Sequence, residues 1–157
     1  MMKTIIIGLG NPILSDDAVG IKVSRLLKQK VQDMQDVDVM ELYAGGLRLL
    51  DALADYHRAI IIDAMTSGNC RPGTIRSLSP SDCGSARNMT CSHDTSLPTA
   101  LKMGAMLGCA LPTVIKIWGI EVQDVETFGE ELTEPVRKAV PIVVRQVVRE
   151  LRGNGTV

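Results

Sequence analysis

Aromatic residues are scarce in this sequence, which holds one Phe, one Trp and two Tyr among its 157 residues. So few aromatic side chains cannot build the stacking platforms on which proteins bind single-stranded nucleic acid. An excess of positive charge is also missing, because 17 Lys and Arg residues face 18 Asp and Glu residues. Without a basic surface the main attraction to a phosphate backbone is lost, so we expect no nucleic-acid partner.

Long apolar runs and closely spaced cysteines are absent as well. No apolar run approaches the roughly 20 residues that cross a bilayer, and the short apolar block at 5–7 does not resemble a signal peptide. We therefore expect a cytoplasmic protein with no membrane insertion. The four cysteines show no Cys-x-x-Cys spacing, so we expect free thiols rather than a zinc site, a redox pair or disulfides: Cys70, Cys83, Cys91 and Cys109.

Apolar residues make up 45% of the chain, enough for the core of a single domain spanning residues 1–157. Strands are expected at 3–8, 37–42, 58–64, 74–78 and 113–120, and helices at 18–31, 47–56, 97–108 and 133–151. This alternation predicts an α/β three-layer sandwich, in which a mostly parallel sheet of about five strands has helices on both faces. We expect a loop or short irregular helix at 79–92, a frayed tail at 153–157, and a monomer.

Polar residues at the ends of the expected strands are candidates for a site, because parallel sheets bind ligands beyond the carboxyl ends of their strands. Asp16 and Asp17 follow the first strand, and one of them is expected to cap the first helix. Asp63 ends a run of three isoleucines, where a charge needs a partner or a chemical role. His93 lies in the polar loop that precedes the helix at 97–108.

In such a fold the side chains of Asp17, Asp63 and His93 can meet in one crevice. Two carboxylate oxygens and one imidazole nitrogen suit a borderline divalent metal such as nickel or zinc. The same three groups suit acid–base catalysis without a metal. Composition and spacing leave both interpretations open.

The segment that starts at Gly8 allows two further interpretations. Gly8-x-Gly10 after a strand resembles the start of a dinucleotide-binding fingerprint, but Ile13 occupies the third glycine position. The two carboxylates that follow would repel a pyrophosphate at the helix N-terminus. Residues 8–12, Gly-Leu-Gly-Asn-Pro, also resemble the opening of peptidyl-tRNA hydrolases, which need a basic surface and an early histidine. The first histidine here is His57, which we expect at the surface.

An ordered set of motifs resembles the [NiFe]-hydrogenase maturation endopeptidases. Residues 8–20, Gly-Leu-Gly-Asn-Pro-Ile-Leu-Ser-Asp-Asp-Ala-Val-Gly, resemble the N-terminal signature of that family. Ile61-Ile62-Asp63-Ala64 and Ser92-His93-Asp94 resemble its second and third motifs, and the resemblance extends to Pro72-Gly73-Thr74 and Trp118-Gly119-Ile120. The motifs occur in the family's order and cover nearly the whole chain.

This resemblance implies a twisted, mostly parallel sheet and an endopeptidase that removes a C-terminal peptide from a [NiFe]-hydrogenase large-subunit precursor. The family's metal-recognition and catalytic positions fall on Asp17, Asp63 and His93, which would contact nickel supplied by the precursor rather than hold a metal tightly. The resemblance leaves open whether the peptidase is of the aspartic type or metal-assisted. A non-catalytic chaperone that holds the nickel-loaded precursor is the alternative.

Supporting roles and departures from the family pattern complete this interpretation. Asp16 would orient Asp17 or cap the helix, Asn11 would support the site, and Gly45 and Gly46 would let a substrate backbone approach closely. Asp17 stands where many relatives carry Glu. Val122 stands where relatives often carry Pro. We expect the acidic stretch to form a solvated face: Glu121, Asp124, Glu126, Glu130, Glu131 and Glu134.

Overall fold

The computed structural model describes residues 2–43, 46–84 and 97–153, which contain a sheet of five strands in the order β2-β1-β3-β5-β4. Four neighbouring strands run parallel, and β4 pairs antiparallel with β5 at the edge. The mostly parallel sheet predicted from the sequence is confirmed. The strands are β1 (Thr4–Leu9), β2 (Val37–Leu42), β3 (Arg58–Met65), β4 (Ile75–Leu78) and β5 (Val114–Glu121).

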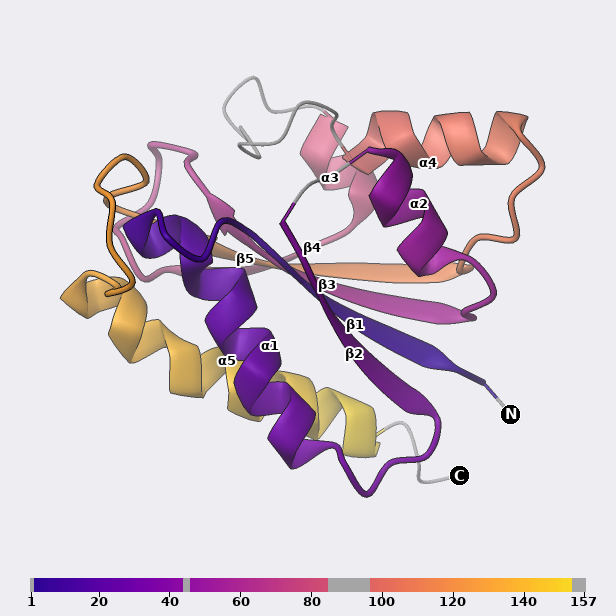
Figure 1. Cartoon of the computed structure of the whole chain (residues 1–157), viewed down its shortest axis with the longest axis horizontal. Helices are drawn as coiled ribbons and strands as arrows, with labels where there is room; N and C mark the ends of the chain where they lie inside the picture. Colours follow the sequence, from indigo (N-terminus) through magenta and orange to yellow (C-terminus); the bar gives the residue numbers. More distant parts are fainter. Residues whose placement is uncertain (1, 44–45, 85–96, 154–157) are drawn as a thin grey trace.

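Helices cover both faces of the sheet, so the predicted three-layer sandwich is also confirmed (Figure 1). One face carries α1 and α5, and the other carries α2, α3 and α4. A short 3-10 helix, η1, leads directly into α1. The helices are η1 (Ser15–Ala18), α1 (Val19–Lys30), α2 (Leu47–Leu53), α3 (Pro80–Gly84), α4 (Leu97–Met106) and α5 (Glu134–Gly153).

The C-terminal helix is longer than the sequence pattern predicts. Helix α5 includes Gly153, which we expected to fray, because the buried Val143 and Val147 hold the helix against the sheet and Leu151 packs beside them. The rest of the expected tail, 154–157, lies outside the described residues. Of the helices in the described part of the chain, none is long and apolar enough to cross a membrane.

Strand β3 explains why its sequence is an unbroken isoleucine run. Ile60 and Ile62 point into the core beneath α1 and α5, whereas Ile61 and Met65 point into the core beneath α2 and α4. A central parallel strand has no face toward water, so both sets of alternating side chains must be apolar. Asp63 continues the series of Ile61 and Met65 and therefore faces the α2–α4 side.

The loops that follow β1 and β3 diverge at the carboxyl edge of the sheet. Helix α1 leads from β1 to β2 on one side, and the chain then crosses back over the opposite face through α2 to reach β3. Because β2 and β4 lie on opposite sides of the β1–β3 pair, the chain that leaves the carboxyl end of β1 and the chain that leaves the carboxyl end of β3 run in opposite directions. Asp17, after β1, and Asp63, at the end of β3, flank this point.

Direct backbone contact fixes α1 against the ends of these two strands. A Cβ atom placed on Gly20 would overlap the carbonyl oxygens of Leu9 and Ile62. A Cβ atom on Gly8 would likewise overlap the carbonyl oxygen of Gly20. Only residues without a side chain allow the helix to approach this closely. These glycines therefore determine how near α1 lies to the ends of β1 and β3.

We predict that Gly20→Ala lowers the free energy of unfolding by about 2 kcal/mol, because the added methyl group forces the helix away from two strand ends. Urea unfolding followed by circular dichroism measures the loss. Gly153→Ala is the matched control, because nothing lies within 4 Å of a Cβ at that position. Equal stability of the two variants would show that α1 shifts without cost.

Candidate functional site

Four charged side chains are buried in the described part of the chain, and all four are acids at the carboxyl edge of the sheet. They are Asp16, Asp17, Asp63 and Glu121, whose exposed fractions are 0%, 3%, 5% and 3%. Burial of a carboxylate costs free energy unless donors or a cation compensate it. The partners of these four acids therefore decide which of them stabilise the fold and which remain candidates for a site.

The carboxylate of Asp16 joins η1 to the loop between β5 and α5. Its Oδ2 atom accepts hydrogen bonds from the amides of Gln123 and Asp124, at 2.9 and 3.0 Å. Thr133, just before α5, donates its amide to Oδ1 at 2.7 Å and its hydroxyl to Oδ2 at 2.8 Å. Asp16 therefore does not cap the first helix as expected, and the N-cap positions of η1 and α1 are Leu14 and Ala18. The Asp16 carboxylate binds the amides of the β5–α5 loop instead of the first turn of the helix.

Ser15 holds the start of η1 in an uncommon conformation. Its φ of +45° lies in the left-handed region, which residues with a Cβ rarely adopt. The hydroxyl of Ser15 donates to the carbonyl of Glu131 at 3.0 Å, and its amide donates to the carbonyl of Gly129 at 3.0 Å. These bonds offset the backbone strain. The turn that they hold places Asp16 and Asp17 at the carboxyl edge of the sheet.

Asp17 is buried beside the turn that follows β1. The amide of Asn11 donates to Asp17 Oδ2 at 3.1 Å, and the Oδ1 atom of Asn11 accepts the amide of Ile13 at 3.1 Å. Gly10 has a φ of +151°, and a Cβ there would overlap the Asp17 carbonyl oxygen. Asn11 therefore contacts Asp17 directly, and the glycine allows the turn to fold back onto η1.

Asp63 is the second buried acid of the predicted trio. It lies near the end of β3 and pairs in register with Gly119 of β5, a position without a side chain. Helix η1 packs against β3, which brings the element that carries Asp17 to the element that carries Asp63. The structure thus places both buried carboxylates at the carboxyl edge of the sheet, on elements that contact each other.

The third predicted ligand, His93, falls at 85–96 and lies outside the described residues, as does Gly45. Gly46 precedes α2 with a φ of +69°, and its carbonyl accepts the amide of Leu49 at 3.1 Å. Within the described ranges, no three His, Cys, Asp or Glu side chains are grouped closely enough to hold a metal ion. His57 is exposed, as predicted, and its Nδ1 atom accepts the amide of Lys3 at 3.1 Å at the opposite edge of the sheet.

Glu121 corrects the interpretation of the acidic stretch. It is buried at the end of β5 rather than solvated, and its carboxylate binds the loop that follows β3. The amide and hydroxyl of Ser67 donate to Oε2 at 3.2 and 2.8 Å, and the amide of Gly68 donates to Oε1 at 3.0 Å. The signal that would have found it is positional, because Glu121 ends a strand just as Asp63 does.

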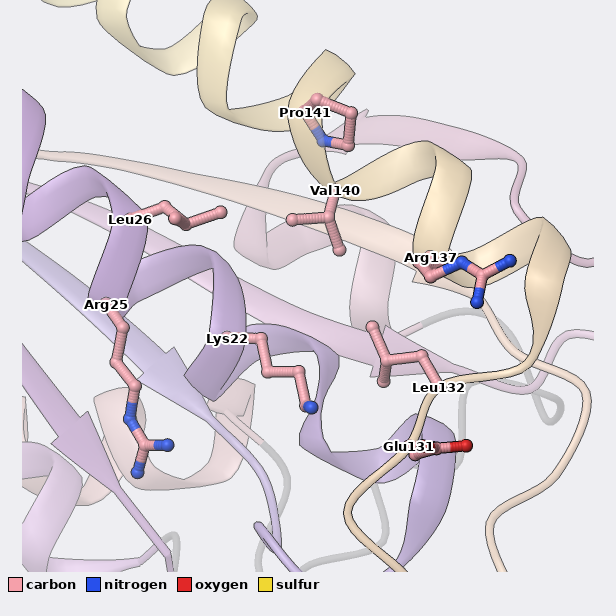
Figure 2. Close-up of a pocket in the computed structure, with 8 residues that line it drawn as sticks. All are labelled: Lys22, Arg25, Leu26, Glu131, Leu132, Arg137, Val140 and Pro141. Carbon is pink, nitrogen blue, oxygen red and sulfur yellow. The ribbon is translucent and has the colours of Figure 1, made fainter.

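A cleft of about 440 Å³ lies between α1 and α5 (Figure 2). Figure 2 shows Leu26 of α1 pointing toward Val140 of α5, while Arg25 points away from α5. Neither Asp17 nor Asp63 lines this cleft. The buried acids and the cleft are therefore separate features of the molecule.

Comparison with known proteins identifies the family. The family model described as HycI, hydrogenase maturation protease, matches residues 21–150. The chain belongs to the hydrogenase maturation protease family. This membership makes the protein a hydrolase of the peptidase class and decides against the peptidyl-tRNA hydrolase alternative. It also favours a catalytic protein over a chaperone.

Individual relatives resemble this protease over almost its entire length. The hydrogenase expression/formation protein HupD of Rhizobium leguminosarum bv. viciae is 25% identical over 156 residues, covering 98% of this chain and 76% of that protein. The hydrogenase 2 maturation protease of Escherichia coli K12 is 26% identical over 155 residues, covering 98% and 93%. The solved structure of the hydrogenase maturating endopeptidase HybD from E. coli superposes with a TM-score of 0.82 at 25% identity, covering 98% and 94%.

We predict that Asp16→Asn destabilises the protease by about 3 kcal/mol, because an amide cannot accept all the hydrogen bonds that converge on the buried carboxylate. Its NH₂ group would face backbone amides that also donate. Urea unfolding measures this loss. Asp51→Asn, on the exposed side of α2, is the matched control and should unfold like the parent protein. A loss of the same size in both variants would contradict the role of Asp16 as a clamp.

Proposed function

We propose that this protease removes a C-terminal peptide from a nickel-loaded [NiFe]-hydrogenase large-subunit precursor. The observation that carries the proposal is the pair of buried carboxylates, Asp17 and Asp63, on neighbouring elements at the point where the sheet connections diverge. Membership of the hydrogenase maturation protease family supplies the reaction class. The proposal therefore assigns the cleavage of this type of substrate to a particular pair of acids.

Nickel reaches this site as part of the substrate. Asp17, Asp63 and His93 contact it, and two carboxylate oxygens with one imidazole nitrogen form a donor set that suits a borderline divalent ion. The buried acids at the carboxyl edge favour the approach of a cation, because charges that are shielded from water act over a longer distance. A precursor without nickel lacks this attraction, so metal insertion precedes cleavage.

Hydrolysis of the scissile bond needs an activated water and a proton for the leaving amine. In the aspartic-type route, a carboxylate of Asp17 or Asp63 takes the proton from water. In the metal-assisted route, the substrate's nickel polarises the scissile carbonyl or the water, and the carboxylates orient it. Replacing nickel in the precursor by zinc separates the routes, since only the metal-assisted rate changes with the Lewis acidity of the ion.

Neighbouring backbone positions support the two acids. The hydrogen bond from the amide of Asn11 fixes one oxygen of Asp17, so the carboxylate keeps a single orientation toward the substrate. Gly46 lies between β2 and α2, Gly45 precedes it in the sequence, and neither residue has a side chain that would obstruct an extended peptide. We assign to these two glycines the close approach of the substrate backbone.

We predict that Asp17→Asn lowers the rate of precursor cleavage by at least about 100-fold, because the neutral amide neither attracts nickel nor accepts a proton from water. Intact-mass spectrometry of the nickel-loaded precursor, incubated with each protease variant, measures the loss of the C-terminal peptide. Asp17→Glu is the matched control. It keeps the carboxylate and should keep most of the activity.

The same assay tests the dependence on nickel. The nickel-free precursor should keep its full mass when it is incubated with the parent protease. Equal cleavage of both precursor forms would remove the metal-recognition role of the acids and leave the peptidase. No cleavage of the correct nickel-loaded precursor would overturn the proposed function as a whole.

A further inference from the structure

Large apolar side chains are exposed where the chain leaves β1, β2 and β5: Ile13, Tyr43, Leu47 and Phe128. Ile13 and Phe128 differ from the other two because backbone pairing joins their segments. Ile13 follows β1 and is 49% exposed, and Phe128 lies in the loop between β5 and α5 and is 79% exposed. Phe128 is the single phenylalanine of the chain. We name these two side chains the Ile13–Phe128 patch.

Backbone hydrogen bonds tie the two halves of the patch together. The amide of Gly129 donates to the carbonyl of Ile13 at 2.8 Å, and the amide of Ser15 donates to the carbonyl of Gly129 at 3.0 Å. Leu14 and Gly129 form an isolated parallel bridge. Figure 1 shows the β5–α5 loop, in orange, beside η1, in indigo. The two exposed side chains are therefore carried on paired segments rather than on independent loops.

The patch is connected to Asp17 through a short series of contacts. The amide of Ile13 donates to Asn11, whose own amide donates to Asp17 Oδ2 at 3.1 Å. On the other segment, Asp16 binds the amides at the start of the β5–α5 loop. Hydrogen bonds from Thr127 and the amide of Glu126 hold the pKa of Asp124 below its ordinary value, so this turn keeps its charge and its shape.

An exposed apolar residue by itself needs no explanation, because every protein surface contains some. This patch differs in that both residues stand on backbone-paired segments, of which one binds Asp17 through Asn11 and the other binds the neighbouring Asp16. Phe128 is mostly exposed and Ile13 is half exposed, so both still have apolar surface that a partner can bury. A rigid apolar surface binds a partner with little loss of conformational freedom, which makes it suited to docking.

We propose that the Ile13–Phe128 patch binds an apolar segment of the large-subunit precursor next to the scissile bond, and thereby selects which peptide bond reaches Asp17. The inference rests on the proposed function, because a protein substrate must lie across the carboxyl edge to reach Asp17 and Asp63. Its occupant is an extended stretch with at least one aliphatic or aromatic side chain. Burial of the patch occurs only in the enzyme–substrate complex.

Steady-state cleavage of the nickel-loaded large-subunit precursor from the same organism tests the proposal. We expect Phe128→Ala to raise KM about tenfold with kcat within about twofold, and Phe128→Leu to raise it less, because the lost contact is made equally in the bound substrate and the transition state. Met106→Ala is the matched control. Met106 is 80% exposed at the end of α4, where the chain turns toward the start of β5 at the opposite edge.

A double-mutant cycle identifies the occupant. The mass of the peptide released by the parent protease locates the scissile bond, and apolar precursor residues within four positions of it are replaced by Ala in turn. When one such replacement is combined with Phe128→Ala, the effect on KM should be smaller than the two single effects together, because both changes remove the same contact. Strict additivity for every position would overturn the assignment of the occupant.

Three outcomes would overturn the inference while leaving the proposed function in place. The first is efficient cleavage by the parent protease with an unchanged KM for Phe128→Ala and Ile13→Ala. The second is an equal rise in KM for Met106→Ala. The third is loss of a dimer in sedimentation by Phe128→Ala without a change in KM, which would make a second copy of this chain the occupant. Failure of the parent protease to cleave would instead overturn the proposed function.

Discussion

The hydrogen bonds of the buried Asp16 carboxylate join a segment near the start of the chain to a loop in its last third. Asp16, near the start of the chain, binds Gln123, Asp124 and Thr133 across sequence separations of 107, 108 and 117 residues. These bonds fix η1 against the loop between β5 and α5, and they place Asp17 and Ile13 on one side of the clamp and Phe128 on the other. The positions of the proposed catalytic acid and of the apolar patch therefore depend on the same interaction.

The sheet order supplies the second constraint on the site. Since the chain runs from β1 toward β2 and from β3 toward β4, on opposite sides of the β1–β3 pair, the loops at the carboxyl ends of β1 and β3 diverge, and Asp17 and Asp63 lie at these ends. Gly8 and Gly20 bring α1 into backbone contact with the strand ends, so the acids lie close to the sheet rather than on a distant loop. A maturation protease can thus hold two carboxylates in fixed positions with a small chain.

Much of this arrangement could be predicted from local sequence. The isoleucine run that ends at Asp63 predicts a strand with two apolar faces, and the rule that sites lie at strand ends points to the edge where the structure places the buried acids. The sequence pattern predicts the start of the helix at 97–108 correctly but places its end beyond Met106, where α4 stops. The helical preference of a residue does not reveal where the packing of a helix ends. The solvated interpretation of Glu121 was wrong, because a carboxylate in an acidic stretch resembles a surface group until its partners are known.

The sequence by itself determined the class of the fold, and it pointed to the sheet edge and the acids that we propose for the site, because hydrophobic periodicity and strand endings are local properties of the chain. The tertiary structure alone decided that Asp16 clamps the β5–α5 loop rather than caps a helix, that Glu121 is buried against Ser67, and that Ile13 and Phe128 share a surface. Each of these depends on hydrogen bonds between segments more than 50 residues apart. Contacts over such separations follow from how the strands and helices pack, and they leave no pattern in neighbouring residues.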